Sequence, residues 1–182
     1  MGAAPSRRRS ERRGRVSSTS SPVVIRRATT ADMPAVGRLG ALLVRLHHEF
    51  DAARFIAASP STPKGYASYL SSQLEEPDVV IFVADSGGDV IGYTYAGVEG
   101  WDYMALRGPA GVVYDIVVDP ARRGQGVGRQ LLDATMSALA ERGAPRVVLS
   151  TAEQNEPAQR LFASAGFRRT MIEMTKEVEG GG

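Results

Sequence analysis

The sequence predicts a single α/β domain in which a mixed, mostly antiparallel sheet is flanked by about four helices. Three observations support this. Segments with helical periodicity and segments with strand periodicity follow one another from residue 23 to residue 178. A Gly-Gly turn at 87–88 joins two β-branched segments, which is typical of an antiparallel hairpin. Later, a glycine-rich loop at 124–128 leads from a strand into a helix, as in a crossover connection.

The sequence pattern of the first third of the domain predicts one strand and two helices. The strand is expected at Val23–Arg27. Thr30 or Asp32 can cap the helix that follows, with Pro34 in its first turn. The apolar residues of that helix recur at helical spacing: Val36, Leu39, Leu43 and Leu46. A second helix is expected from Pro63 to Glu75, because one face carries Tyr66, Leu70 and Leu74.

The sequence pattern in the middle of the chain predicts three strands and a long loop. Val79–Ala84 and Val90–Tyr95 are rich in β-branched and aromatic residues and form the hairpin. Trp101–Pro109 is expected to be a loop, and Gly111–Val118 is expected to be the next strand.

The C-terminal part predicts helices alternating with strands. A helix is expected over Gly126–Arg142, followed by a strand over Arg146–Thr151. Asn155 caps a short helix that Gly166 ends. Phe167–Val178 is expected to form the last strand or strand pair. The expected order is therefore β-α-α-β-β-β-α-β-α-β.

Composition narrows the class of protein. The chain has 182 residues and no cysteine, which excludes disulfides, thiolate nucleophiles and cysteine metal sites. It has no run of 18 apolar residues, so no membrane span is expected, and we expect a cytoplasmic protein that holds no metal. Residues 179–182 are expected to be a flexible tail.

The basic residues are concentrated at the N-terminus. Residues 1–22 contain six Arg and one Glu, a net charge of +5, whereas residues 23–182 have a net charge of −3. Such a Ser- and Arg-rich segment is expected to be disordered, although it also fits a transit peptide or a nucleic-acid arm. Because the folded part is slightly acidic, nucleic-acid binding is disfavoured.

The glycine-rich loop is the most informative segment. Gly124, Gly126 and Gly128 have no Cβ, so a ligand can approach the backbone closely. The unpaired amides at the start of the following helix favour an anion, and Arg122, Arg123 and Arg129 add positive charge. This chemistry predicts a pyrophosphate site. The glycine spacing does not fit a dinucleotide loop, and the lysine of a nucleoside-triphosphate loop is absent. A tight connection without a ligand is the alternative.

The loop resembles the acetyl-CoA loop of the GNAT superfamily of N-acetyltransferases. That loop begins with Gln or Arg and continues with two glycine positions, here Arg123, Gly126 and Gly128. A second segment from Asn155 to Phe167 is similar to the family's Asn-to-Gly-Phe element. The resemblance identifies residues 23–178 as a GNAT-type N-acetyltransferase domain.

The resemblance implies which residues bind the coenzyme. The backbone of the fourth strand, at Ile116, Val117 and Val118, would pair with the pantetheine arm, and a bulge there would supply an oxyanion donor. The loop and second element would complete the site: Arg123, Gly124, Gln125, Gly126, Val127, Gly128, Arg129, Asn155 and Phe162. Asn155 fits a helix cap as well as a ligand contact.

Proton-handling residues depart from the family pattern. Relatives place a general acid or base at three positions that hold Phe162, Ser150 and Val112 here. The loss of such a group costs about 10²–10⁴ in rate. The replacements available are Asp115, which could bind the cationic amine or relay its proton, and Tyr114, which could donate to the thiolate. A solvent-facing acid and a packing tyrosine are the alternatives.

The resemblance implies transfer of an acetyl group from acetyl-CoA to a primary amine by direct attack in a ternary complex. The acceptor is a small amine or a protein amine, and a homodimer is compatible because dimers are frequent in the family. A non-catalytic acyl-CoA-binding module is the alternative, and a nucleic-acid-associated protein ranks third.

His47 and His48 are adjacent on a helix, so they point to different faces and make a poor metal pair. We expect each to be a solvated or packed histidine. The other interpretation is that one of them is a base in the substrate pocket.

Overall fold

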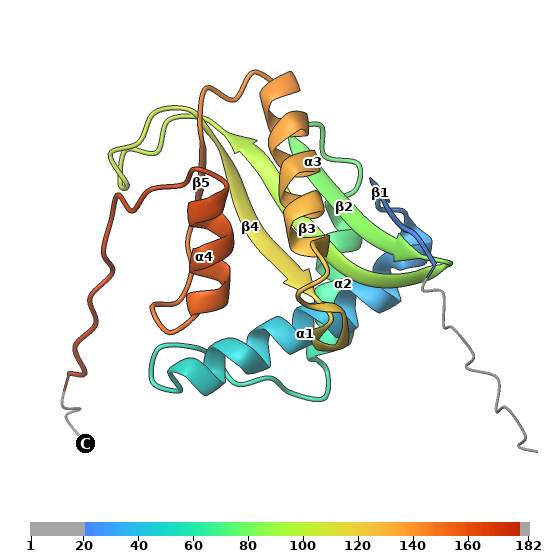
Figure 1. Ribbon diagram of the computed structural model, residues 1–182. Helices are drawn as coiled ribbons and strands as arrows, with labels where there is room; N and C mark the ends of the chain where they lie inside the picture. The colour runs from blue at the N-terminus through green and yellow to red at the C-terminus, as the bar shows by residue number, and fades with distance from the viewer. Residues whose placement is uncertain (1–20, 179–182) are drawn as a thin grey trace, which may run out of the picture.

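The computed structural model describes residues 21–178 (Figure 1). The predictions of a disordered basic segment at 1–22 and a flexible end at 179–182 fall almost wholly outside this range.

One five-stranded sheet forms the centre of the molecule, with its strands in the order β1-β2-β3-β4-β5. Its neighbours are antiparallel except for β4 and β5, which are parallel. The strands are β1 (Val23–Arg27), β2 (Val79–Ser86), β3 (Asp89–Glu99), β4 (Ala110–Val118) and β5 (Val147–Leu149). The mixed α/β sheet predicted from the sequence is thus confirmed.

Four helices cover the two faces of the sheet (Figure 1). Helices α1 (Met33–Phe50) and α2 (Thr62–Ser72) pack on one face, and α3 (Val127–Glu141) packs on the other, with α4 (Glu156–Ser164) beside it. Short 3-10 turns, η1 (Thr30–Asp32) and η2 (Pro120–Arg122), precede α1 and α3. Helix α2 ends before the predicted Glu75, because the chain turns at residues 73–75 to enter β2.

Alternating side chains of the strands supply the core on both faces. On β2, Ile81 and Val83 face α1 and α2, while Val80 and Ala84 pack on the α3 side. Two buried threonines, Thr94 and Thr135, join β3 to α3 by a hydrogen bond of 2.7 Å between their hydroxyls. The core therefore fixes β3 and β4 between two layers of helices.

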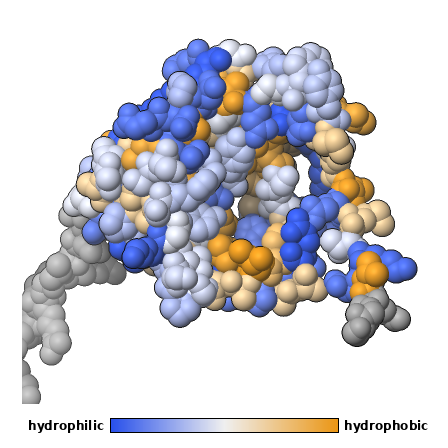
Figure 2. Space-filling view, turned by 180° about the vertical axis from the view of Figure 1, so that it is seen from behind, coloured by the Kyte–Doolittle hydropathy of each residue, from blue (hydrophilic) through white to orange (hydrophobic). Residues whose placement is uncertain are grey.

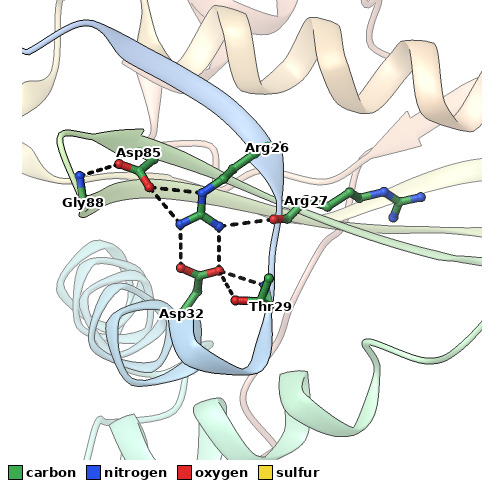
Figure 3. Close-up of polar contacts among 6 residues, drawn as sticks. All are labelled: Arg26, Arg27, Thr29, Asp32, Asp85 and Gly88. Atoms are coloured by element: carbon green, nitrogen blue, oxygen red, sulfur yellow. Dashed lines mark hydrogen bonds and ion pairs between the residues drawn. The ribbon is translucent and has the colours of Figure 1, made fainter.

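Arg26 ties the N-terminal strand to its neighbours through two carboxylates (Figure 3). Its guanidinium donates to both oxygens of Asp32 at 2.8 Å and to Asp85 of β2 at 2.8 Å. Asp32 also accepts from the amide and hydroxyl of Thr29. Asp32, one of the two residues expected to cap this helix, occupies the N-cap position of α1, but its side chain makes no cap hydrogen bond to α1 and holds β1 against the start of the helix.

The C-terminal strand predicted over Phe167–Val178 is wrong. The backbone after Gly166 runs away from the sheet past α4 and pairs with no strand of the described chain (Figure 1). Four of its apolar side chains are largely exposed: Met171, Ile172, Met174 and Val178. A β-rich composition favours an extended backbone, but a strand also needs a hydrogen-bonded neighbour, and β5 is left as the edge of the sheet.

The Arg26 network predicts a pH-dependent contribution to stability. Hydrogen bonds from Arg26 lower the pKa of Asp32 from 3.8 to about 2. A carboxyl with a depressed pKa stabilises the folded state above its unfolded pKa, and this contribution is lost as the pH falls toward about 2. We expect Asp32→Asn to lower the free energy of unfolding by about 2 kcal/mol at neutral pH, measured by urea denaturation.

The difference should shrink as the pH is lowered below about 4. Asp133→Asn breaks an exposed ion pair with Arg129 on α3 and serves as the control, with an expected effect below about 1 kcal/mol. Equal losses in the two variants would contradict this account of Asp32.

Candidate functional site

The strands β4 and β5 separate halfway along β4. They pair only over Gly111–Val113 and Val147–Leu149, so the edge of β4 from Tyr114 to Val118 that faces β5 has no strand partner. A cavity of ≈ 240 Å³ occupies this opening, which we call the β4–β5 cavity. Its lining comes from α1, α2, β4, β5 and α4 and from the loops after α1 and β5.

A β-bulge lies on β4 at the mouth of this opening. Tyr95 pairs with Asp115 and Ala96 pairs with Val113, which leaves Tyr114 as the extra residue. The bulge expected within Ile116–Val118 therefore lies upstream of those residues. An extra residue changes the side-chain alternation, so Val113 packs on the α3 side whereas Tyr114 and Asp115 both line the cavity near α1 and α2.

The glycine-rich loop has the backbone that an anion site requires. Gly124 and Gly126 have φ of 74° and 79°, in the left-handed region that favours glycine. Gly126 is the N-cap of α3. Among the described residues, the first amide of α3 that has a backbone acceptor is that of Gln130, which donates to the carbonyl of Gly126 at 3.1 Å. The amides between Arg123 and Arg129 are therefore available at a helix N-terminus.

Side chains of the loop hold its shape. Arg122 donates to Gln125 at 3.3 Å and to Ser86 at 3.2 Å, and Arg123 donates to the carbonyl of Val118 at 3.3 Å. Arg129 donates to Asp133 and to the carbonyl of Ser164, which joins α3 to α4. Val127 is buried, and Gly128 lets α4 approach, since a Cβ there would lie 3.3 Å from Leu161.

The second predicted element lines the far wall of the β4–β5 cavity. Asn155 caps α4 by accepting from the amide of Ala158 at 3.3 Å, and it also borders the cavity. Phe162 and Ser150, which stand where relatives carry proton-handling groups, border the cavity as well. This wall therefore supplies no carboxylate or phenol for acid–base chemistry.

Asp115 is the carboxylate of the cavity. The hydroxyl of buried Tyr93 donates to it at 2.9 Å, and the hydroxyl of Tyr66 also stabilises its charged form. Burial nevertheless dominates and raises the pKa of Asp115 above its ordinary value of 3.8. A carboxylate with a raised pKa is a better proton acceptor than one in water.

Tyr114 and Asp115 also border a second cavity of ≈ 360 Å³ between α2 and the sheet. We call it the tyrosine cavity, and its lining is Gly65, Tyr66, Tyr69, Leu70, Tyr95, Tyr114 and Asp115. The Tyr114 ring packs against Tyr95 in a tilted arrangement with 4.7 Å between centroids, and its hydroxyl donates to Glu99 at 2.6 Å. Figure 2 shows the molecule hollowed on the side opposite to the view of Figure 1, with apolar surface near the opening.

His47 enters the β4–β5 cavity from α1. Its Nδ1 lies 2.9 Å from the carbonyl of Leu43, which can only accept, so Nδ1 carries the proton and Nε2 of the neutral ring has a free lone pair. Phe55 holds the ring edge-on at 5.0 Å. His48 instead bonds the carbonyl of Phe55 at 2.8 Å and lines neither cavity. The sequence left the role of His47 open, because its orientation depends on the loop after α1.

Comparison with known proteins assigns the family. A profile of the Acetyltransferase (GNAT) family matches residues 43–167, and the chain belongs to this family. A mycothiol acetyltransferase of Thermobispora bispora is 34% identical over 129 residues, which cover 67% of this chain and 42% of that protein. The chain thus spans less than half the length of this relative.

Solved structures agree on the fold. A mutant of a Bacillus halodurans protein superposes with a TM-score of 0.74 at 23% identity, covering 86% of this chain and 99% of that one. The aminoglycoside N-acetyltransferase AAC(6')-Iy, solved in complex with CoA, superposes with a TM-score of 0.64 at 18% identity, covering 91% and 100%.

Residues 21–178 contain neither a membrane-spanning helix nor a cluster of metal ligands. No helix in this range has the length and apolar character needed to cross a bilayer. No three His, Asp or Glu side chains of the range gather as metal ligands would.

The raised pKa of Asp115 predicts a stabilising substitution. A carboxyl whose pKa is raised on folding weakens the folded state as the pH rises above its unfolded value of about 4, because the charge must be buried. Asp115→Asn keeps an acceptor for Tyr93 without the charge. We expect its free energy of unfolding at neutral pH to equal or exceed that of the parent, with the difference vanishing in acid. A clear loss of stability at neutral pH would show that the charged form is favoured in the fold.

Proposed function

We propose that the protein transfers an acetyl group from acetyl-CoA to a primary amine by direct attack in a ternary complex. The observation that carries the proposal is the continuity of the site: the amides at 124–129, which have no acceptor among the described residues, adjoin the end of β4, and the unpaired edge of β4 leads to Asp115. This is the order in which diphosphate, pantetheine arm and thioester follow one another in the coenzyme.

The coenzyme would be held mainly by the backbone. The amides between Arg123 and Arg129 would bind the diphosphate, and residues Ile116–Val118 would pair with the amide groups of the pantetheine arm. Asn155 and Phe162 would border the arm from α4. An amide of β4 beyond the bulge would donate to the oxyanion of the tetrahedral intermediate.

The amine must lose a proton before or during its attack. Its solution pKa is about 10, so the ammonium form enters the site and is attracted by Asp115. We assign Asp115 and the Nε2 of His47 as the groups that receive this proton, because both line the β4–β5 cavity. The nitrogen then attacks the thioester carbon. Its second proton passes to whichever of these two groups is still unprotonated, or to the departing sulfur, as the carbon–sulfur bond breaks and the thiolate leaves.

Tyr114 as the donor to the thiolate stays a prediction. Its ring borders both cavities, but its hydroxyl donates to Glu99 in the free protein. Donation to sulfur would require the hydroxyl to turn away from Glu99. A thiolate with a pKa near 8.5 can also leave without such help.

If the glycine-rich loop binds the coenzyme, a substitution in it should lower coenzyme affinity by more than an equally destabilising substitution elsewhere. In Gly126→Ala a side chain is forced into the left-handed region, which moves the amides that would bind the diphosphate. We expect acetyl-CoA affinity to fall at least about tenfold, measured by titration calorimetry.

Gly143 provides a matched control, because its φ of 81° imposes the same strain at the opposite end of α3. Gly143→Ala should cost comparable stability and leave coenzyme affinity unchanged. Equal affinity losses in the two variants would remove the loop from the binding site.

The proton-accepting assignments predict slow variants that still bind the coenzyme. Asp115→Asn and His47→Asn should each lower turnover at least about tenfold with little change in acetyl-CoA affinity. Asparagine at position 47 can keep the hydrogen bond to Leu43 but has no lone pair that accepts a proton.

His48→Asn is the control, since it changes the neighbouring histidine outside both cavities. Its turnover should match that of the parent. Unchanged turnover in Asp115→Asn would rule out that residue, and unchanged turnover in His47→Asn would rule out His47. Coenzyme binding without thiol release for every amine tested would instead favour a non-catalytic acyl-CoA-binding module.

A further inference from the structure

The walls of the tyrosine cavity define the chemistry of the molecule that fits there. Four of its lining residues are tyrosines, and the others are Leu70, Gly65 and Asp115. Asp115 is therefore the one carboxylate in the lining, and no lysine or arginine belongs to it. The cavity offers a place for a single positive charge at Asp115 and an aromatic surface for the rest of the ligand.

The hydroxyl groups of this cavity are already engaged by the protein. Tyr69 and Tyr95 share a hydrogen bond of 3.2 Å, and Tyr95 also donates to Gln73 at 3.3 Å. Tyr114 donates to Glu99. A ligand therefore meets the rings more than the hydroxyls, which favours an apolar body over a polyhydroxylated one.

Glu99 is not free to hold a second ammonium group. Its carboxylate accepts from Arg107 at 2.5 Å, and Arg107 also lies 3.7 Å from Asp102. An acceptor with several positive charges would place all but one of them against tyrosine rings and Leu70 without a carboxylate partner. An ammonium group held in the cavity without a carboxylate partner gives up hydration that the tyrosine rings replace only in part, whereas an apolar body gives up none, so the cavity favours one positive charge over several.

The two cavities meet at the residue that would receive the proton. Tyr66, Tyr114 and Asp115 line both of them. A molecule seated in the tyrosine cavity with its nitrogen at Asp115 would thus have that nitrogen at the end of the opening in which the thioester lies. The volume of ≈ 360 Å³ suits a molecule of fragment size.

We propose, on the basis of the proposed function, that the acceptor is a primary amine with one positive charge and an apolar aliphatic or aromatic body. The tyrosine cavity holds the body and Asp115 holds the ammonium group. Polyamines and aminoglycosides, which carry several ammonium groups, are then poor acceptors.

Two matched amines test the charge requirement. Hexylamine and hexane-1,6-diamine have the same carbon chain and differ by a second ammonium group. We expect kcat/KM, measured by thiol release from acetyl-CoA, to be at least about tenfold higher for hexylamine, and 2-phenylethylamine to exceed spermidine and kanamycin. A preference for the diamine, spermidine or kanamycin would overturn the proposal while leaving acetyl transfer intact.

Variants of the cavity wall test the location. Tyr69→Ala removes a ring from the cavity and should lower kcat/KM for 2-phenylethylamine about tenfold, mainly through KM. Tyr69→Phe keeps the ring and should recover most of that loss. Tyr103→Ala removes an exposed ring that lines neither cavity and should have no effect. Equal effects at positions 69 and 103 would place the acceptor elsewhere, whereas absence of thiol release with every amine would contradict the proposed function itself.

Discussion

The site depends on one constraint in the sheet: β4 loses its partner β5 after Val113 and gains an extra residue at Tyr114. Loss of the partner leaves a free backbone edge and an opening where a linear ligand with amide groups can lie. The extra residue changes the alternation of side chains, so two consecutive residues point into the same region. Unpaired backbone groups and the carboxylate of Asp115 thereby meet at one point of the strand, where the proposed function requires the coenzyme and the acceptor to meet.

The surroundings of Asp115 show how the fold keeps a carboxylate there. Tyr93 and Tyr66 favour its charged form, whereas burial disfavours it more strongly, so its pKa rises. Keeping this carboxylate buried therefore weakens the folded state at neutral pH, and its raised pKa suits the proton-accepting role proposed for it. Gly97 takes part as well, because a Cβ there would lie 3.3 Å from the hydroxyl of Tyr114 and crowd its ring. The aromatic wall beside the acid is therefore built by packing and not only by composition.

Features of the site that depend on neighbouring residues could be predicted from the sequence, whereas features that depend on contacts between distant segments could not. The loop at 124–128 could be predicted, because positive φ values and free amides follow from glycine spacing before a helix. The bulge on β4 was expected in the wrong place, because strand alternation in Gly111–Val118 carries no mark of an extra residue. The strand expected at Phe167–Val178 failed because pairing requires a partner that composition cannot reveal. The tyrosine cavity escaped prediction because α2, β3 and β4 contribute its residues from distant parts of the chain.

The central claim is that the opening beyond Val113 and the amides beside it together hold coenzyme A. A crystal structure of the protein with the coenzyme tests this most directly. Our account predicts diphosphate oxygens within hydrogen-bonding distance of amides between Arg123 and Arg129, with the pantetheine arm along Ile116–Val118 and its sulfur near Asp115. Coenzyme bound at another surface, with the β4–β5 cavity empty, would contradict it.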